Sequence, residues 1–372
     1  MEIQRTPLVS PSLGTTRELV SYHYGPAHAA RRIVIQSSVH ADETPGMLVA
    51  WVLKRRLAEL ERDGLLRARI VIVPVANPVG LNQRVAGTLI GRFETDSGQN
   101  FNRRFLDIAA LVGDSLDGQL SGDEARNGLL ARKAVRDMLD ARTPRTELES
   151  LQLALHRLAA EADLVLDLHC SLEGVLHLYT HEAAWPTFEP LARYLGVGTS
   201  LLCGDSGGHS FDEALNLGWS RLIERFGRER PIPAGPLAVC VELRGLYDVS
   251  HALAEHDADA ILQFIGLRGG IAGGVSPPPD LIREPMPLTG SEQIDAPCAG
   301  VLVYRTPLGA WVKRGDPIAD IVDPMSDQVT TLVAGVEGVL FTRRVVRYVH
   351  TGAMVAQIAG GTPFREGNLL TA

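Results

Sequence analysis

Short apolar runs rich in β-branched residues alternate with longer amphipathic stretches through the first two thirds of the chain. The apolar runs predict buried strands, and they read RRIVIQSS, ARIVIVPVAN, ADLVLDLH and PLAVCVELRG. Helical periodicity follows in GMLVAWVLKRRLAELERDG, which stops at Gly64, and again at residues 128–139 and 146–162. This alternation predicts an α/β fold, with a mixed, mostly parallel sheet flanked by helices.

Ionisable residues stand where three of the predicted strands end. His40, His169 and Glu242 each follow an apolar run. Ligands of such sheets bind beyond the carboxyl ends of the strands. We therefore expect these three side chains at one functional edge.

The pattern changes from Gly269 onward. GGIAGGVSPPPD is typical of a linker, and short strands with turns follow it. A weak repeat joins GVLVYRTPLGAWVKRGDPIADI, from Gly300, to GVLFTRRVVRYVHTGAMVAQI, from Gly338. Two such copies predict a small β-sandwich that resembles biotinyl and lipoyl modules. The hairpin VDPMSDQ between the copies lacks the lysine that those carriers modify, so we expect a structural or substrate-gating part.

Two domains follow from these patterns. Residues 1–275 are expected to form the catalytic α/β domain, and residues 276–372 the small β domain. Residues 106–161 are expected to form a helical insertion in the first, as a lid or a dimer contact.

Composition excludes several classes of protein. The net charge of −8 argues against a nucleic-acid binder, and the four widely spaced cysteines argue against a disulfide framework or a cysteine zinc site. The N-terminus shows no signal peptide and no apolar run is long enough to span a bilayer, so we expect a cytoplasmic protein without membrane contact. The oligomeric state, a homo-oligomer included, stays open.

The segment IQSSVHADETPG suggests a metal site. His40 and Glu43 offer imidazole and carboxylate donors, which suit Zn²⁺, at a strand-to-helix turn. His169 is the best candidate for a third ligand, with one position left for water. Asp167 lies on the same side of its strand and can orient a ligand histidine.

Each of these signals is weak alone. H-x-x-E occurs by chance in many proteins, and a single histidine after a strand is more often a hydrogen-bonded structural group. The joint pattern carries more weight, because buried ionisable groups are costly without a partner.

Arginine and glutamate residues complete the pattern. In GQNFNRRF, Asn102 and Arg103 form a plausible carboxylate clamp, although the pair taken alone favours a capped turn with a surface arginine. Arg92 can polarise a carbonyl oxygen, with Arg84 as the competing choice. Glu242 can accept and return a proton, or it can pair with Arg244, which can instead face the substrate. The loop CGDSGGHSFDEALN can also line the site, or it can have no catalytic part.

In this order, VHADE, NFNRRF, LDLHCS and VELRG resemble the succinylglutamate desuccinylase/aspartoacylase family, zinc enzymes related to the M14 metallocarboxypeptidases. The resemblance covers most of the first 270 residues. It implies a zinc carboxypeptidase-like fold and one Zn²⁺ per chain. It assigns the residues as follows: His40, Glu43 and His169 to the metal, Asn102 and Arg103 to the substrate carboxylate, Glu242 to general base and acid, and Arg92 to the oxyanion. The family's Asp-Leu-Asn-Arg stretch reads Asn100-Phe101-Asn102-Arg103 here, so an aspartate is replaced.

Hydrolysis of the amide bond of an N-acyl amino acid, or of a similar small carboxylate-bearing amide, fits this set best. A metallocarboxypeptidase acting on peptide C-termini shares the same zinc centre and remains an alternative. A second alternative is a non-catalytic binding protein that has kept the fold.

Overall fold

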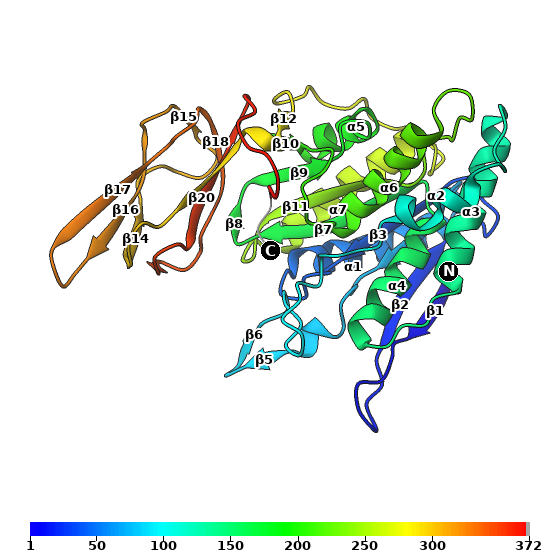
Figure 1. Cartoon of the computed structure of the whole chain (residues 1–372), viewed down its shortest axis with the longest axis horizontal. Helices are drawn as coiled ribbons and strands as arrows, with labels where there is room; N and C mark the ends of the chain where they lie inside the picture. The colour runs from blue at the N-terminus through cyan, green and yellow to red at the C-terminus, as the bar shows by residue number, and fades with distance from the viewer. Residues whose placement is uncertain (370–372) are drawn as a thin grey trace.

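Strands formed by the four apolar runs lie side by side at the centre of a mixed sheet. The computed structural model describes residues 1–369 (Figure 1). Across this part of the chain the sheet runs, edge to edge, through β1 (Glu2–Pro7), β2 (Glu18–Tyr24), β4 (Arg69–Val73), β3 (Arg32–Ser37), β7 (Leu164–Ser171), β11 (Leu237–Gly245), β9 (Leu176–Thr180), β10 (Thr199–Leu202) and β12 (Met286–Pro287). Strands β4, β3, β7 and β11 are mutually parallel, whereas β1, β2 and β9 pair antiparallel with β2, β4 and β11. The predicted mixed, mostly parallel sheet is confirmed.

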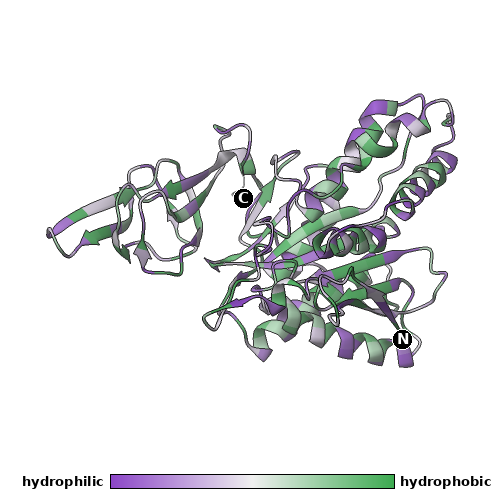
Figure 2. Ribbon diagram, turned by 60° about the horizontal axis from the view of Figure 1, so that its bottom comes forward, coloured by the Kyte–Doolittle hydropathy of each residue, from purple (hydrophilic) through white to green (hydrophobic). Residues whose placement is uncertain are grey.

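Helices cover both faces of this sheet. One layer contains α1 (Pro45–Arg62), α5 (Trp185–Leu195) and α7 (His251–Leu267), and the other contains α2 (Ile108–Leu116), α3 (Glu124–Asp140), α4 (Glu147–Ala160) and α6 (Phe211–Phe226). Each layer buries its own apolar cluster against the strands. Figure 2 shows hydrophobic strands in the middle and helices that are hydrophilic on their outer sides. The segment expected as a helical insertion thus supplies α2, α3 and α4, which form part of a covering layer.

The Pro-Gly pair after Glu43 explains how α1 starts so close to the sheet. Pro45 occupies the first turn of the helix, where its missing N–H costs nothing. A Cβ on Gly46 would lie 2.8 Å from the Cβ of Ser37 and 3.1 Å from that of Leu168, so a side chain would push the helix away. Ser38 has a φ of 62°, a left-handed conformation that costs energy in a non-glycine residue and turns the chain sharply.

The Gly- and Pro-rich segment is fastened to the large sheet domain. Backbone N–H groups of Arg67 and Ala68 both donate to the carbonyl of Gly270, and the Tyr194 hydroxyl donates to the carbonyl of Ser276. The chain then adds β12 beside β10. The central sheet therefore receives its last strand from beyond residue 275, where we expected the boundary.

Two further sheets pack face to face around a separate apolar cluster. Their strands, in sheet order, are β13 (Ser291–Asp295), β20 (Met354–Gly360), β18 (Gly338–Arg343) and β15 (Trp311–Val312), and then β17 (Gln328–Val333), β16 (Pro317–Asp323), β14 (Gly300–Tyr304) and β19 (Tyr348–Val349). The short middle strand of each repeat pairs with the first strand of the other repeat. In the first repeat this strand is β15, which pairs with β18, and in the second it is β19, which pairs with β14. This exchange gives the predicted sandwich of two related halves.

Short elements connect these parts. The strand β8 (Glu173–Gly174) leaves the large domain to pair antiparallel with β18, and it thereby ties the two parts together. The remaining elements are the β5 (Arg84–Val85) and β6 (Thr88–Leu89) hairpin and the short 3-10 helices η1 (Gly80–Asn82) and η2 (Leu288–Gly290).

Candidate metal centre and substrate pocket

Three predicted metal ligands converge at the carboxyl ends of two neighbouring strands. His40 and Glu43 lie in the turn between β3 and α1, and His169 lies near the end of β7. Glu43 bridges the two rings, because its Oε1 lies 2.9 Å from His40 Nδ1 and its Oε2 lies 2.8 Å from His169 Nδ1. One ligand atom from each residue lies within 4.8 Å of the others, and all three side chains are buried. We call these residues the triad.

The outer ring nitrogens of both histidines are already engaged. His40 Nε2 lies 2.8 Å from the Oδ1 of Asn100, and His169 Nε2 lies 2.9 Å from the Oδ2 of Asp167. Gln36 donates to the other oxygen of Asp167 at 3.1 Å. These contacts orient the rings so that both Nδ1 atoms face the Glu43 carboxylate. Asp167 thus contacts His169, the histidine two residues later in its strand, and Asn100 makes the corresponding contact with His40.

The charges of the triad suit a cation. Burial and the nearby Arg92 lower the pKa of His40 to about 4, so its ring is neutral at pH 7. Burial alone would raise the pKa of Glu43, but the two histidines hold it well below its usual range. Burial likewise opposes the charge on His169, yet Asp167 and Glu43 raise its pKa well above the usual value, so this ring carries a proton that a metal ion would displace. An ionised carboxylate between two imidazoles is then a donor set that fits a divalent ion such as Zn²⁺.

A cavity of about 240 Å³ opens beside the triad, and we call it the substrate pocket. Glu242 of β11 lines it and stands opposite His169 in the register of β11 and β7. Its Oε2 accepts a long hydrogen bond of 3.4 Å from Ser171 Oγ. Burial, reinforced by the negative charge of Glu43, raises the pKa of Glu242 to about 7. A carboxylate with such a pKa can take up and release a proton near neutral pH.

Arg92, Asn102 and Arg103 also line the substrate pocket. Arg92 is half-buried and donates to Glu43 Oε1 at 2.7 Å. Asn102 accepts the backbone N–H of Phe211 at 2.9 Å through Oδ1, which leaves its Nδ2 on the side of His169. Two arginines and an amide therefore face the same space as the triad and Glu242.

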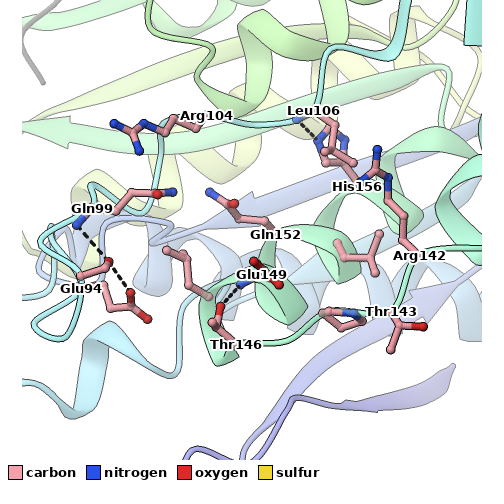
Figure 3. A pocket seen from close by; sticks show the side chains of 14 residues that line it. Glu94, Gln99, Arg104, Leu106, Arg142, Thr143, Thr146, Glu149, Gln152 and His156 are labelled. Atoms are coloured by element: carbon pink, nitrogen blue, oxygen red, sulfur yellow. Dashed lines mark hydrogen bonds between the residues drawn. The ribbon is translucent and has the colours of Figure 1, made fainter. Parts of the chain in front are cut away.

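Helix α4 holds the loop that carries Asn102 and Arg103, which we call the clamp loop (residues 98–106). Gln152 Nε2 donates to the carbonyls of Phe101 and Arg103 at 3.2 and 3.0 Å. One turn later, His156 Nε2 accepts the N–H of Leu106 at 3.0 Å (Figure 3). These hydrogen bonds hold the clamp loop in position against α4.

A second cavity of about 530 Å³ separates part of the clamp loop from α4. Figure 3 shows Gln99 and Arg104 of the loop on one side and Glu149 and Gln152 of the helix on the other. Among the described residues that line it, none belongs to the triad or to the substrate pocket. The larger cavity is therefore not where the metal chemistry can occur.

Two arginines considered from the sequence do not line the substrate pocket. Arg244 faces α7, where its two terminal nitrogens donate to the buried Asp257 at 2.9 and 3.0 Å. We expected Arg244 to bind substrate, but this ion pair occupies it instead. Arg84 is exposed in β5 and lines none of the described pocket, so Arg92 is the arginine that lies beside the triad.

Several pocket residues were not singled out from the sequence. Tyr179, Ser210 and Asp212 line one side, and the C-terminal sheets contribute Thr342, Met354 and Gln357. The glycines and His209 of the loop CGDSGGHSFDEALN suggested that this loop lines the site. The residues that it contributes to the substrate pocket are Ser210 and Asp212. No local motif marks the three C-terminal residues, because only the packing of β18 and β20 beside β8 brings them there.

Comparison with known families agrees with this geometry. The family model for the succinylglutamate desuccinylase/aspartoacylase catalytic domain matches residues 29–268. The chain belongs to this family. The matched range contains the triad, the clamp loop and Glu242, and it ends before the C-terminal sheets.

Several solved structures share the architecture over nearly the whole chain. A succinylglutamate desuccinylase/aspartoacylase family protein from Shewanella amazonensis is 27% identical, with a TM-score of 0.84 over 96% of this chain and 98% of its own. A succinylglutamate desuccinylase/aspartoacylase from Shewanella frigidimarina has the same fold at 24% identity, with a TM-score of 0.84 over 97% of this chain and 98% of its own. The ectoine utilization protein EutE (DoeB) from Ruegeria pomeroyi, solved with product bound, shares the fold at 17% identity, with a TM-score of 0.68 over 96% and 95%.

No significant match was found among curated proteins. Among the helices formed by residues 1–369, none is long and apolar enough to cross a membrane.

Proposed function

We propose that the protein is a zinc-dependent deacylase that hydrolyses the amide bond of a small N-acyl amino acid. One observation carries the proposal: one cavity of about 240 Å³ is lined by the two histidines of the triad, by Glu242 and by Arg92 and Arg103, and Glu43 lies between the two histidines. Amide hydrolysis of this kind needs a Lewis acid, a proton acceptor and a charged anchor for the substrate. Glu242 and the arginines would supply the last two, and the triad would hold the ion that supplies the first.

His40, Glu43 and His169 would hold the ion. When bound, Zn²⁺ would polarise the scissile carbonyl and make a water molecule more acidic. Glu242 accepts the proton of the attacking water and later returns it to the departing amine. A pKa of about 7 suits both halves of this transfer, because the carboxylate and the carboxylic acid are then both accessible.

Arginine side chains position the substrate and its developing charge. Arg103 and the Nδ2 of Asn102 bind the substrate carboxylate, so the amide lies over the triad. Arg92 stabilises negative charge on the former carbonyl oxygen. Its hydrogen bond to Glu43 supports this role, because it holds the guanidinium beside the triad.

The decisive test is a screen of N-acyl amino acids with zinc-loaded protein, with released amine as the readout. We expect turnover of at least one acyl amino acid, loss of activity after chelation, and recovery with Zn²⁺. Release of C-terminal residues from peptides, without turnover of acyl amino acids, would instead identify a carboxypeptidase. Protein that binds no zinc and loses nothing on Glu242→Gln substitution would contradict enzymatic activity at this site.

A further inference from the structure

The larger cavity, between the clamp loop and α4, has the size of a small-molecule site, although no step of the proposed hydrolysis uses it. Its volume of about 530 Å³ lies within the range of about 300–1,000 Å³ that is usual for such sites. Apolar side chains form part of its wall, namely those of Leu106, Pro144, Leu148 and Leu153. The cavity can therefore take a small molecule with an apolar body, and its polar groups decide which kind.

His156 lines this cavity and carries a buried hydrogen-bond donor without an acceptor. The residue is 1% exposed. Its Nε2 accepts the backbone N–H of Leu106, so the ring hydrogen of the neutral imidazole lies on Nδ1. This Nδ1 has no hydrogen-bond partner among residues 1–369. An unpaired buried donor is costly, so its presence points to an acceptor that a ligand supplies.

Arg142 adds a positive charge beside this donor. Figure 3 shows the end of its side chain next to the ring of His156. Burial and the charge of Arg142 lower the pKa of His156 to about 4, so the ring is neutral at pH 7. The Nε of Arg142 donates to the Met138 sulfur at 3.3 Å, but within the described chain its terminal nitrogens make no hydrogen bond or ion pair. Two donors and one positive charge therefore meet here without an acceptor.

The carboxylates that line the cavity do not neutralise Arg142. Glu149 precedes His156 by seven residues on α4, which corresponds to about 10 Å along the helix axis. Its Oε2 accepts a backbone N–H at 2.7 Å. Glu94 accepts a hydroxyl hydrogen bond within its own turn. Neither carboxylate forms an ion pair with any of residues 1–369, so the charge of Arg142 is left for a ligand.

We propose that this end of the cavity is a second ligand site, which binds the carboxylate of a small organic acid through His156 Nδ1–H and the Arg142 guanidinium. A carboxylate offers one oxygen to each donor, and its pair with a guanidinium is among the stronger polar contacts. The apolar part of the wall favours an acid with a hydrocarbon body over inorganic phosphate. Binding at this site does not depend on the proposed deacylase activity.

Occupation of the site should stabilise the clamp loop. A hydrogen bond donated from Nδ1 makes Nε2 of the same ring a better acceptor for the Leu106 N–H, because hydrogen bonds in a chain polarise one another. The clamp loop also carries Asn102 and Arg103. An effect of the acid on KM therefore rests on the proposed function, whereas its binding and its effect on the loop do not.

Calorimetry with hexanoate and its neutral isostere hexanamide tests the site. All proteins are zinc-loaded and carry Arg103→Gln, so that binding at the proposed clamp is weakened and binding at the metal is common to all. We expect hexanoate to bind more tightly than hexanamide, and Arg142→Gln to weaken hexanoate binding at least about tenfold. Arg145→Gln, an exposed change in the same connection between α3 and α4, should bind as its parent does.

Three results of this titration would overturn the proposal. One is equal hexanoate binding in the Arg142→Gln and Arg145→Gln proteins, and another is equal binding of the acid and the amide. The third is phosphate binding that is stronger than hexanoate binding and is lost with Arg142, which would identify a site for inorganic anions.

Two further measurements address the imidazole and the loop. His156→Gln places an amide oxygen near the position of Nε2 but removes Nδ1–H, so we expect hexanoate binding to weaken several-fold. Hexanoate should slow hydrogen exchange of the Leu106 amide in the parent protein and leave it unchanged in Arg142→Gln. Equal exchange with and without hexanoate in the parent would contradict the effect on the clamp loop. Neither measurement needs turnover, so a protein without deacylase activity would still confirm or refute the site.

Discussion

His40 Nε2 lies 2.8 Å from the Oδ1 of Asn100, so a neutral carboxamide accepts the outer hydrogen bond of this histidine. The outer nitrogen of His169 faces the carboxylate of Asp167 instead. The two imidazoles of the triad are therefore supported unequally. Asn100 Oδ1 also accepts the backbone N–H of Asn102 at 2.8 Å, whereas its Nδ2 is buried without a partner among the described residues.

A carboxylate at position 100 should strengthen metal binding. Partners of this kind change metal affinity by about 10–100-fold, so we expect Asn100→Asp to tighten zinc binding about tenfold. Competition with a chromogenic chelator measures this directly. The metal-free variant should melt earlier than wild type, because the new charge is buried. Asn82→Asp, an exposed control, should change neither quantity, and equal zinc affinities for Asn100→Asp and wild type would contradict the role of Asn100.

The pH dependence of activity should follow Glu242. This carboxyl must be ionised to accept a proton, and burial raises its pKa to about 7 in the metal-free protein. A bound cation can only lower that value, so kcat/KM should fall as the pH drops through an apparent pKa at or below 7. Glu242→Gln should lower kcat by about 10²–10⁴-fold with zinc content unchanged. A Glu242→Gln enzyme that keeps the acidic limb and its rate would show that another group accepts the proton.

Removing the donor of Gln152 should weaken substrate binding. Gln152→Glu keeps the shape of the side chain but cannot donate to the carbonyls of Phe101 and Arg103. The clamp loop should lose its fixed position, and we expect KM to rise about tenfold with a smaller change in kcat. Gln119→Glu, exposed after α2, serves as the control and should leave KM unchanged. A fall in kcat alone would place the effect on the chemical step.

Acid should destabilise the protein through His156. Burial and the charge of Arg142 lower its pKa to about 4, below the 6.5 of an unperturbed histidine. A lowered pKa gives stability that is full above pH 6.5 and is lost as the pH falls toward 4. His156→Gln should therefore lose less stability between pH 7 and 5 than wild type, as urea titrations at the two pH values would show. His28→Gln, an exposed change, should behave as wild type, and an equal loss in His156→Gln would exclude this histidine as a cause.

The contact between the two parts of the chain should affect KM more than stability. Arg343 of β18 donates to both oxygens of Glu173 at 2.9 and 3.0 Å, and its neighbour Thr342 lines the pocket. Both side chains are partly exposed, so Arg343→Ala should cost at most about 1 kcal/mol of stability. We expect KM to rise several-fold, because loss of the ion pair should let Thr342 move at the edge of the substrate pocket. Arg305→Ala, which breaks an exposed pair with Asp320, is the control and should leave KM unchanged.

Local sequence signals predicted the strands and the turn that carries His40 and Glu43, because both are encoded in short windows. The apolar runs and the turn after His40 need no distant partner to be recognised. Arg244 shows the limit of this reasoning, since a strand-end arginine points equally well to a substrate or to an acid elsewhere. Asp257 on α7 decides between them, and nothing near Arg244 in the sequence indicates that pairing.

For the same reason, the sequence did not predict the contact of Asn100 with His40. It also did not predict which C-terminal residues line the substrate pocket. Asn100 lies sixty residues from His40, so the replaced aspartate could be noted but its partner could not be named. Thr342 and Gln357 reach the pocket only because two separately encoded sheets meet at β8. Such positions depend on tertiary packing, which a single sequence does not reveal.

Because β8 pairs with β18, residues of the large sheet domain and of the C-terminal sheets together enclose the substrate pocket. Strand β8 begins two residues after the end of β7, the strand that carries His169. A protein cut after residue 275 would keep the triad and Glu242 but would lose Thr342, Met354 and Gln357 from the opposite side. The substrate pocket would then lack one side, and water would reach the residues proposed to bind the substrate. If the proposed function holds, changes in β18 and β20 would alter one side of the substrate pocket while the triad, Asn102 and Arg103 stay in place.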